Sequence, residues 1–302
     1  MSEHPKAYPL VQCVACGGSL TLFGCREGYR YDRCLACGTL QLNPMPDPDW
    51  LREAYAERYH AAGHYAEDPE QRNRHGRRVF AAMVKTYTDL GGHIAGPVLD
   101  YGCGWGGLLD LLRAAGIPAE GADLSRTMGA YCRSRGHTIH EMELQQLAQQ
   151  RPGAYSGVFM SAVFEHLPEP DKALAAVYTL LRKDGLFISL QPTAGFARFF
   201  GTLFRAGIKR LPLPRLHEVI CPPWHTVLYT PEGMKRIAER AGFSLGGVFR
   251  GPVQTGTGPA GAVKDALELA NRAGWSLLGA RWPLCICHIF ALRKKVPAQK
   301  ET

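Results

Sequence analysis

Residues 98–107 read VLDYGCGWGG, and this stretch constrains the fold more than any other part of the 302-residue chain. An apolar run leads into Asp100, and glycines follow at positions 102, 104, 106 and 107. This order predicts a strand that ends in a tight glycine turn, from which a helix begins. Because glycine has no side chain, such a turn lets a small ligand approach the backbone closely.

Short apolar runs alternate with helical patterns from residue 94 onwards, which predicts an α/β sheet. The expected strands are residues 97–101, 117–123, 138–140, 156–163, 185–192 and 284–295. The expected helices are residues 107–115, 125–135, 171–181 and 230–242, and LRKDG at 181–185 is predicted to be a turn.

Two acidic residues at strand ends indicate what the glycine turn binds. Asp100 would repel a pyrophosphate, whereas its carboxylate suits a cationic ligand such as the amino group and sulfonium of S-adenosylmethionine. Asp123 closes the second strand, where an acid can accept hydrogen bonds from both hydroxyls of a ribose. Asp123 would suit NAD equally well, so only Asp100 favours S-adenosylmethionine over NAD.

Four stretches follow one another in a recognisable order: VLDYGCGWGG, GADLS, FEHLPEPDKALAAVYTLLRKDGLFISLQP and YTPEGMKRIAERAGF. They resemble the successive motifs of class I S-adenosylmethionine-dependent methyltransferases. The resemblance covers roughly residues 94–250 and the closing strand. It implies a Rossmann-like, seven-stranded methyltransferase sheet whose last strand runs antiparallel, together with an N-terminal zinc ribbon described below.

The resemblance also implies a set of cofactor contacts. The methionine part would lie against the glycine turn, the ribose against Asp123, and the adenine beside the loop around residues 142–143. The positions implied for the cofactor are Asp100, Gly102, Cys103, Gly104, Gly106, Asp123, Leu124, Met142 and Glu165.

The N-terminal region contains two matching cysteine pairs, CVACG at 13–17 and CLACG at 34–38. Each CxxC turn points two thiolates at one ion, so the pairs predict a tetrahedral site for one zinc ion with ligands Cys13, Cys16, Cys34 and Cys37. Four thiolates leave no open coordination position, and the zinc is therefore expected to be structural. The alternative role for the ribbon is binding of nucleic acid or of a substrate carrier.

Composition and patterning suggest three zones and a location. We expect a ribbon at 1–46, a helical linker or lid at 47–93, and a methyltransferase domain at 94–302 with an acceptor-pocket insertion at about 192–230 and a C-terminal apolar helix. No apolar run is long enough to span a membrane, and the N-terminus lacks the order of a signal peptide. These features predict a cytoplasmic protein.

Three histidines are candidates for the catalytic base of methyl transfer. His166 follows the fourth strand, while His217 and His225 lie in LHEVICPPWHTVLYT, which also offers the flat rings of Trp224 and Tyr229. A histidine titrates near neutrality and can therefore take a proton from an acceptor. Each histidine can also be a satisfied structural residue, and the pair Glu165–His166 can belong to the scaffold around the cofactor.

The predicted function is transfer of a methyl group from S-adenosylmethionine to a small-molecule, glycan or natural-product acceptor. One alternative is an RNA methyltransferase in which the ribbon and the arginines at 72–78 contact phosphate; the net charge of +8 permits this. A second alternative is a non-catalytic scaffold protein with the methyltransferase fold. An NAD oxidoreductase is the least favoured of the alternative functions. The amphipathic segment 196–211 is interpreted as a lid helix, with peripheral membrane contact as the alternative.

Overall fold

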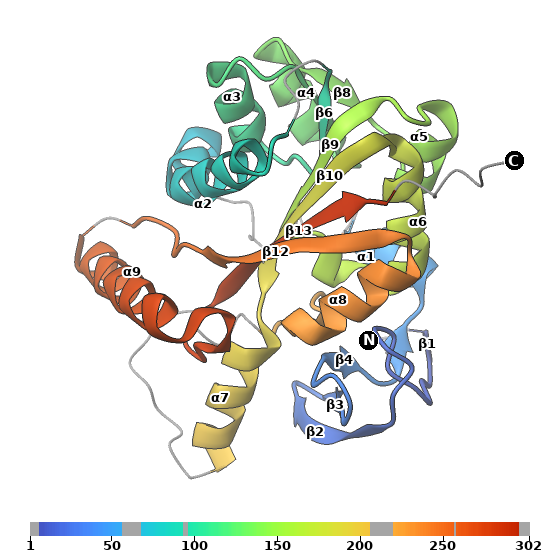
Figure 1. Cartoon of the computed structure of the whole chain (residues 1–302), viewed down its shortest axis with the longest axis vertical. Coiled ribbons are helices and arrows are strands. Elements are labelled where there is room, and N and C mark those ends of the chain that lie inside the picture. The colour runs from blue at the N-terminus through green and yellow to red at the C-terminus, as the bar shows by residue number, and fades with distance from the viewer. Residues whose placement is uncertain (1–5, 56–67, 93–95, 206–219, 257, 296–302) are drawn as a thin grey trace, which may run out of the picture.

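The computed structural model describes residues 6–55, 68–92, 96–205, 220–256 and 258–295 (Figure 1). Its main sheet has seven strands in the order β12-β13-β10-β9-β6-β7-β8. The bounds are β6 (Val98–Tyr101), β7 (Ala119–Ala122), β8 (Thr138–His140), β9 (Tyr155–Ser161), β10 (Leu181–Pro192), β12 (Phe243–Gly251) and β13 (Cys287–Lys294). The strands from β8 to β10 pair in parallel, whereas β13 runs antiparallel to both of its neighbours. The predicted fold class is confirmed.

One local prediction differs from the structure. Residues 181–185 were expected to form a turn, but they are the first part of β10. Leu181 already pairs with Tyr155 of β9, and the register shifts between Leu181 and Leu186. Asp184, within this shift, has φ 61°, so the polar residues form an irregularity inside the strand and do not interrupt it.

Apolar helix faces cover both sides of the sheet. On one side α2 (Pro69–Asp89) and α3 (Gly107–Ala114) pack on one set of strand side chains. On the other side lie α5 (Leu144–Gln150), α6 (Pro170–Leu180) and α8 (Pro231–Arg240). Neighbouring strand residues alternate between the sides, as Val98 and Leu99 do. Two further helices are α4 (Arg126–Ser134) and α9 (Gly258–Leu278).

The cysteine-rich N-terminal region forms a second sheet, in the order β11-β4-β3-β2. Its strands are β2 (Leu20–Arg26), β3 (Tyr29–Cys34), β4 (Leu40–Leu42) and β11 (Val227–Leu228). The short strands β1 (Ala7–Tyr8) and β5 (Met45–Pro46) pair beside it, before α1 (Pro48–Ala54). Because β11 comes from the distant segment before α8, the ribbon is joined to the methyltransferase body by strand pairing.

The helix α7 (Ala194–Arg205) begins where the amphipathic segment was predicted. Phe196 is buried in a cluster with Ala194, Ala197, Leu40 of the ribbon and Leu228, whereas Phe199 is 36% exposed. The end of the predicted helix and the candidate His217 lie outside the described residues. No helix in the described part of the chain is both long and apolar enough to cross a membrane.

Candidate functional site

The glycine turn after β6 has the predicted backbone. Gly102, Gly104 and Gly106 have φ values of 75°, 51° and 74°, a region that residues with side chains rarely adopt. A Cβ atom on Gly102 would lie 2.5 Å from Val163 Cγ2, so this glycine is also required by a close approach from the loop after β9. The turn thus brings the ends of β6 and β9 together, with α3 beginning directly after it.

Asp100 has a polar atom that lacks a partner. The residue is only 2% exposed, and its Oδ1 makes no hydrogen bond with the described residues. Burial, together with the nearby charge of Asp123, raises the pKa of Asp100 to about 8. An unpartnered buried acid is what a cationic amino group or sulfonium would satisfy, so this position fits S-adenosylmethionine.

Asp123 is held by the backbone at the end of β7. Its two carboxylate oxygens accept hydrogen bonds from the backbone N–H groups of Gly104 and Ser125, both at 2.8 Å. Each carboxylate oxygen can accept more than one hydrogen bond, so the hydroxyls of a ribose can bind here as well. The bond to Gly104 also fixes the glycine turn against Asp123.

The other residues implied for the cofactor differ in exposure. Cys103 is buried in the turn, and hydrogen bonding to Cys132 together with burial raises the pKa of its thiol. Leu124 is 49% exposed beside Asp123, and Met142 packs half-buried against the core. Met142 lies just before Glu143, which forms an ion pair with Arg52 of α1 at 2.6 Å. None of these contacts opposes a role at the cofactor.

Glu165, His166 and His225 form a compact cluster beyond the end of β9. Glu165 and His166 lie in a short 3-10 turn, η2 (Phe164–His166), and His225 lies just before β11. One ligand atom from each residue lies within 4.8 Å of the others, so the three side chains can share a proton or hold a cation. The imidazole rings of His166 and His225 lie 4.9 Å apart, centroid to centroid. The structure therefore unites two of the three predicted histidines.

The contacts around His166 and Glu165 bear on where protons lie in the cluster. His166 Nδ1 lies 2.9 Å from the carbonyl oxygen of Trp224, which can only accept, so this contact favours the tautomer with the proton on Nδ1 and the lone pair on Nε2, in which the Tyr55 hydroxyl also accepts from Nδ1. Nε2 lies 3.9 Å from a carboxylate oxygen of Glu165. Glu165 is fully buried, neither of its oxygens has a partner among the described residues, and burial raises its pKa to about 8.

Two aromatic side chains extend the cluster, and one was not singled out as a site residue from the sequence. The Tyr55 hydroxyl hydrogen-bonds His166 Nδ1, and the Tyr55 ring lies 4.8 Å from the Trp224 ring. Tyr55 follows α1, far from the other residues in sequence, so only the fold brings it here. Thr226 donates from both its N–H and its hydroxyl to the Glu165 carbonyl, which fixes the loop next to η2.

The four ribbon cysteines lie close together as predicted. Cys13 Sγ is 3.7 Å from Cys37 Sγ, and Cys16 Sγ is 3.4 Å from Cys34 Sγ. Zn–S bonds of about 2.3 Å in a tetrahedron separate the sulfurs by about 3.8 Å. The four ligand atoms all lie within 4.8 Å of one another, so the donor set fits zinc. The exposed Cys25 lies outside this cluster.

Two of the arginines of α2 have acidic partners. Arg74 pairs with Glu70 at 3.6 Å within the helix, and Arg78 pairs with Asp265 of α9 at 2.9 Å. Acidic partners reduce the attraction that these two side chains offer to phosphate.

The sheet order, the glycine turn and the two strand-end acids together define a class of protein, the S-adenosylmethionine-dependent methyltransferases. Residues 50–245 match the family model described as a methyltransferase domain. This match covers more than half of the chain, and the chain therefore belongs to the S-adenosylmethionine-dependent methyltransferase family. The resemblance noted in the sequence motifs is confirmed.

Several curated methyltransferases are similar in sequence. A ubiquinone biosynthesis O-methyltransferase of Methylococcus capsulatus is 33% identical over 109 residues, covering 34% of this chain and 45% of the relative. One from Aeromonas salmonicida is 30% identical over 183 residues, covering 55% and 72%. A demethylmenaquinone methyltransferase of Thermus thermophilus is 29% identical over 164 residues, covering 49% and 74%. The chain thus spans between about half and three quarters of the length of these relatives.

Two solved structures share the fold. The 1,6-didemethyltoxoflavin-N1-methyltransferase of Burkholderia thailandensis, bound to 1,6-didemethyltoxoflavin and S-adenosylhomocysteine, has a TM-score of 0.55 and 14% identity, and covers 91% of this chain and 99% of that one. The magnesium protoporphyrin IX methyltransferase of Synechocystis, bound to S-adenosylhomocysteine, has a TM-score of 0.50 and 17% identity, and covers 82% and 100%.

Proposed function

We propose that this protein transfers a methyl group from S-adenosylmethionine to a hydroxyl group of a small-molecule acceptor. The observation that carries the proposal is the cluster of Glu165, His166 and His225 beside the glycine turn. The Methylococcus and Aeromonas relatives, both named O-methyltransferases, support the choice of a hydroxyl. A hydroxyl acceptor must lose a proton when it is methylated, and a base is therefore needed next to the methyl donor.

The cofactor position follows from the unpartnered groups at the ends of β6 and β7. Asp100 would bind the cationic part of the cofactor and Asp123 its ribose, with the glycines giving access to the backbone. When bound, S-adenosylmethionine supplies an activated methyl group on a sulfonium. Displacement at that methyl requires the acceptor oxygen in line, so positioning contributes much of the rate.

His166 is proposed as the base. The Trp224 carbonyl holds the proton on Nδ1, which leaves Nε2 to take the proton from the acceptor hydroxyl. The positive charge that then forms on the imidazole lies beside the Glu165 carboxyl, whose ionised form would stabilise it. The Tyr55 and Trp224 rings offer apolar walls for a flat acceptor and reduce its contact with water.

The proposed zinc ion serves the fold in this account. Its four thiolate ligands would complete its coordination, so no step of the reaction is assigned to it. The pairing of β11 with β4 connects the ribbon to the segment that carries His225 and Trp224. The ribbon would therefore hold one wall of the acceptor site in place.

A test of the function compares acceptors and base variants. The full-length protein is incubated with S-adenosylmethionine and a set of catechol, alkyl hydroxyl and amine compounds, and S-adenosylhomocysteine is measured by mass spectrometry. We expect turnover with a hydroxyl acceptor, and a decrease in kcat of about 10²–10⁴-fold in His166→Gln with unchanged cofactor affinity. His140→Gln is the matched control, because His140 pairs with Glu120 on the outer part of the sheet.

The proposal fails if amines are methylated and hydroxyl compounds are not, or if His166→Gln keeps the wild-type kcat. Single-stranded RNA is included as an acceptor. Methylation of RNA alone, lost when salt is raised, would instead support the nucleic-acid alternative.

A further inference from the structure

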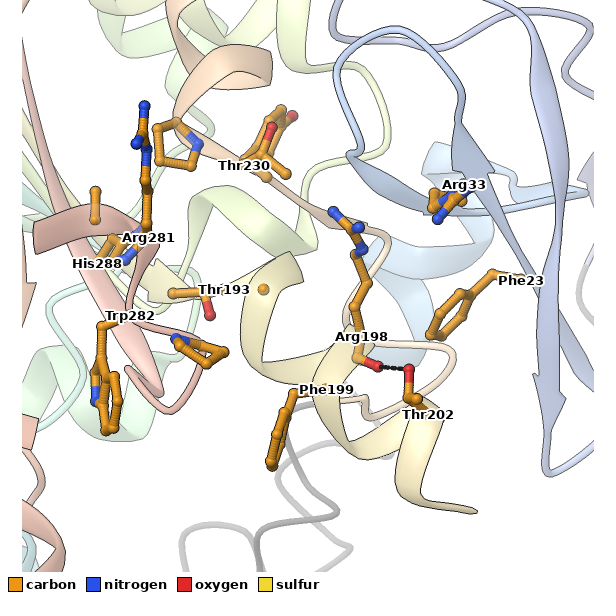
Figure 2. A pocket seen from close by; sticks show the side chains of 15 residues that line it. Phe23, Arg33, Thr193, Arg198, Phe199, Thr202, Thr230, Arg281, Trp282 and His288 are labelled. Carbon is orange, nitrogen blue, oxygen red and sulfur yellow. Dashed lines mark hydrogen bonds between the residues drawn. The ribbon is translucent and has the colours of Figure 1, made fainter. Parts of the chain in front are cut away.

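A second site lies between the ribbon and the methyltransferase body. A cavity of about 530 Å³ is lined by β2 and β3 of the ribbon, the start of α7, the start of α8, the short 3-10 turn η4 (Gly279–Arg281) and β13. Figure 2 shows the side chains of Arg33, Arg198 and Arg281 around this cavity, with Arg198 between the other two. No step proposed for methyl transfer uses these arginines.

The described residues do not balance the charge in this cavity. None of the described residues that line it is an aspartate or a glutamate. Within the described part of the chain, Arg33, Arg198 and Arg281 form no ion pair. Burial, and the charge of Arg33, lower the pKa of Arg198. Like charges held together in a partly buried cavity are stabilised by a bound anion.

Uncharged donors lie in the same cavity. His288 is 3% exposed, and neither of its ring nitrogens has a partner among the described residues. Burial lowers the pKa of His288 to about 4, so the ring is neutral near pH 7 and retains one N–H donor. The backbone of Gly195, in the first turn of α7, also lines the cavity, where the helix dipole favours negative charge.

Aromatic side chains give the cavity room for more than an ion. Phe23, Phe199 and Trp282 line it together with the arginines (Figure 2). The combination of guanidinium groups and flat rings suits a ligand that has an anionic group attached to an apolar or ring-shaped part.

A short stretch of the chain connects the cavity with the proposed methyl-transfer site. Tyr229 and Thr230 line the cavity, while His225 belongs to the base cluster. Tyr229 also stacks on Phe164 of η2, with ring centroids 5.4 Å apart. An extended chain covers about 3.3 Å per residue, so Thr230 lies at most roughly 16 Å from His225 along the chain. One acceptor of that length could reach both places.

We propose that this cavity binds a phosphate or diphosphate group of the acceptor, held by Arg33, Arg198 and Arg281 with His288 as an additional donor. The statement that the bound molecule is the methyl acceptor rests on the proposed function. It gives the ribbon a part in recognition, since Phe23 and Arg33 form one wall. Arg198 also lies against the second cysteine knuckle, where a Cβ atom on Gly38 would be 3.1 Å from its Nη1.

Binding of inorganic pyrophosphate to the full-length protein tests the anion site without any need for turnover. Isothermal titration is carried out with the wild type, Arg198→Gln and Arg281→Gln, and with Arg74→Gln as the control because Arg74 lies on α2. We expect each cavity variant to lower pyrophosphate affinity at least 10-fold, and Arg74→Gln to leave it unchanged. Arg281 is exposed, so its substitution tests the site even if Arg198→Gln disturbs the ribbon.

Three results would overturn this proposal. The first is absence of pyrophosphate binding to the wild type, and the second is equal affinity in the wild type and Arg281→Gln. The third is binding of single-stranded RNA or of phosphatidylglycerol vesicles that depends on Arg281 while pyrophosphate does not bind. Methyl transfer to a hydroxyl compound is measured separately, so failure of the proposed function and failure of the anion site give different results.

Discussion

The ribbon and the base cluster both bring reactive side chains to one point, but they do so by different means. Cys13 and Cys37 are 24 positions apart, and their sulfurs are brought together by two local turns and a hairpin. Tyr55 and His166 are 111 positions apart, and they meet only because the folded chain brings the end of α1 to η2. A site made by local turns can be predicted from spacing, whereas a site made by topology needs the structure.

The two regions also differ in what completes them. The ribbon thiols lie within 4.8 Å of one another, an arrangement that a zinc ion would hold. The base cluster is fixed by protein contacts, through the bonds of Thr226 to the Glu165 carbonyl and of His166 to the Trp224 carbonyl. We therefore expect substitution of a cysteine to change stability most, and changes at the sheet edge to affect ligand binding more than folding.

The largest expected effect is that of Cys34→Ser. Removal of one of four ligands should abolish stoichiometric zinc binding and lower the melting temperature, because structural zinc contributes directly to folding. Cys25→Ser is the matched control, since Cys25 is exposed and lies outside the cluster. Zinc is measured by elemental mass spectrometry and unfolding by circular dichroism. A Cys34→Ser protein that keeps one zinc per chain would contradict the ribbon assignment.

The next effect concerns the cofactor. Asp100→Asn keeps the shape but cannot ionise to the carboxylate that a cationic cofactor would stabilise, and we expect S-adenosylmethionine affinity to fall about 100-fold without loss of folding. Asp89→Asn, on the exposed end of α2, is the control. Isothermal titration measures the affinity. Equal affinity in the wild type and Asp100→Asn would remove Asp100 from the cofactor site.

The pH dependence of stability distinguishes the two regions further. Asp100 and Glu165 have pKa values raised to about 8 in the folded protein, so their stabilising effect is complete below pH 4 and is lost as pH rises through 8. Each contributes up to about 1.4 kcal/mol per pH unit in that range. The lowered pKa values of Glu120 and Glu268 act at more acidic pH. The pKa of His288, lowered from 6.5 to about 4, makes stability rise with pH only up to about pH 6.5, so the two acids together outweigh it.

Urea unfolding of the cofactor-free protein at pH 5.5, 7 and 8.5 measures this effect. We expect the free energy of unfolding to fall as pH rises, and the fall to be smaller in Asp100→Asn. A stability that increases between pH 5.5 and 8.5 would show that the two buried acids are ionised in the folded protein.

The smallest effect is expected at the contact that connects the two regions. The hydroxyl of Tyr31, on β3 of the ribbon, donates to the His225 carbonyl at 2.8 Å. Tyr31→Phe should cost about 0.5–1.5 kcal/mol of stability because it removes this part-buried hydrogen bond. Tyr178→Phe, which loses an exposed hydrogen bond to Lys295, should cost less. Equal melting temperatures for the two variants would show that this contact adds no stability.

Much of the fold could be predicted from the sequence because its signals are local. The alternation of apolar runs and helical patterns, the glycine turn and the CxxC pairs each depend on neighbouring residues. The turn expected at 181–185 was wrong because Asp184 adopts a positive φ inside β10, where pairing of Leu181 with Tyr155 extends the strand. Tertiary pairing outweighed the local turn signal there.

The site could be predicted only in part, for the same physical reason. Asp100 is the last residue but one of β6 and His166 lies in the short 3-10 turn that follows β9, and the ends of parallel strands share one edge of the sheet. Tyr55 and the cavity arginine Arg281 lie in segments whose position depends on long-range packing, and no spacing pattern marks them. The unpaired charge of the cavity became visible only when the neighbours of each arginine were known.

The most direct test of the central claim is native mass spectrometry of the full-length protein, as purified and after addition of S-adenosylmethionine. The account predicts one zinc per chain, together with a second mass shift equal to S-adenosylmethionine or S-adenosylhomocysteine that is absent in Asp100→Asn. A chain that carries zinc but takes up neither compound at any concentration would contradict the account and favour a non-catalytic scaffold.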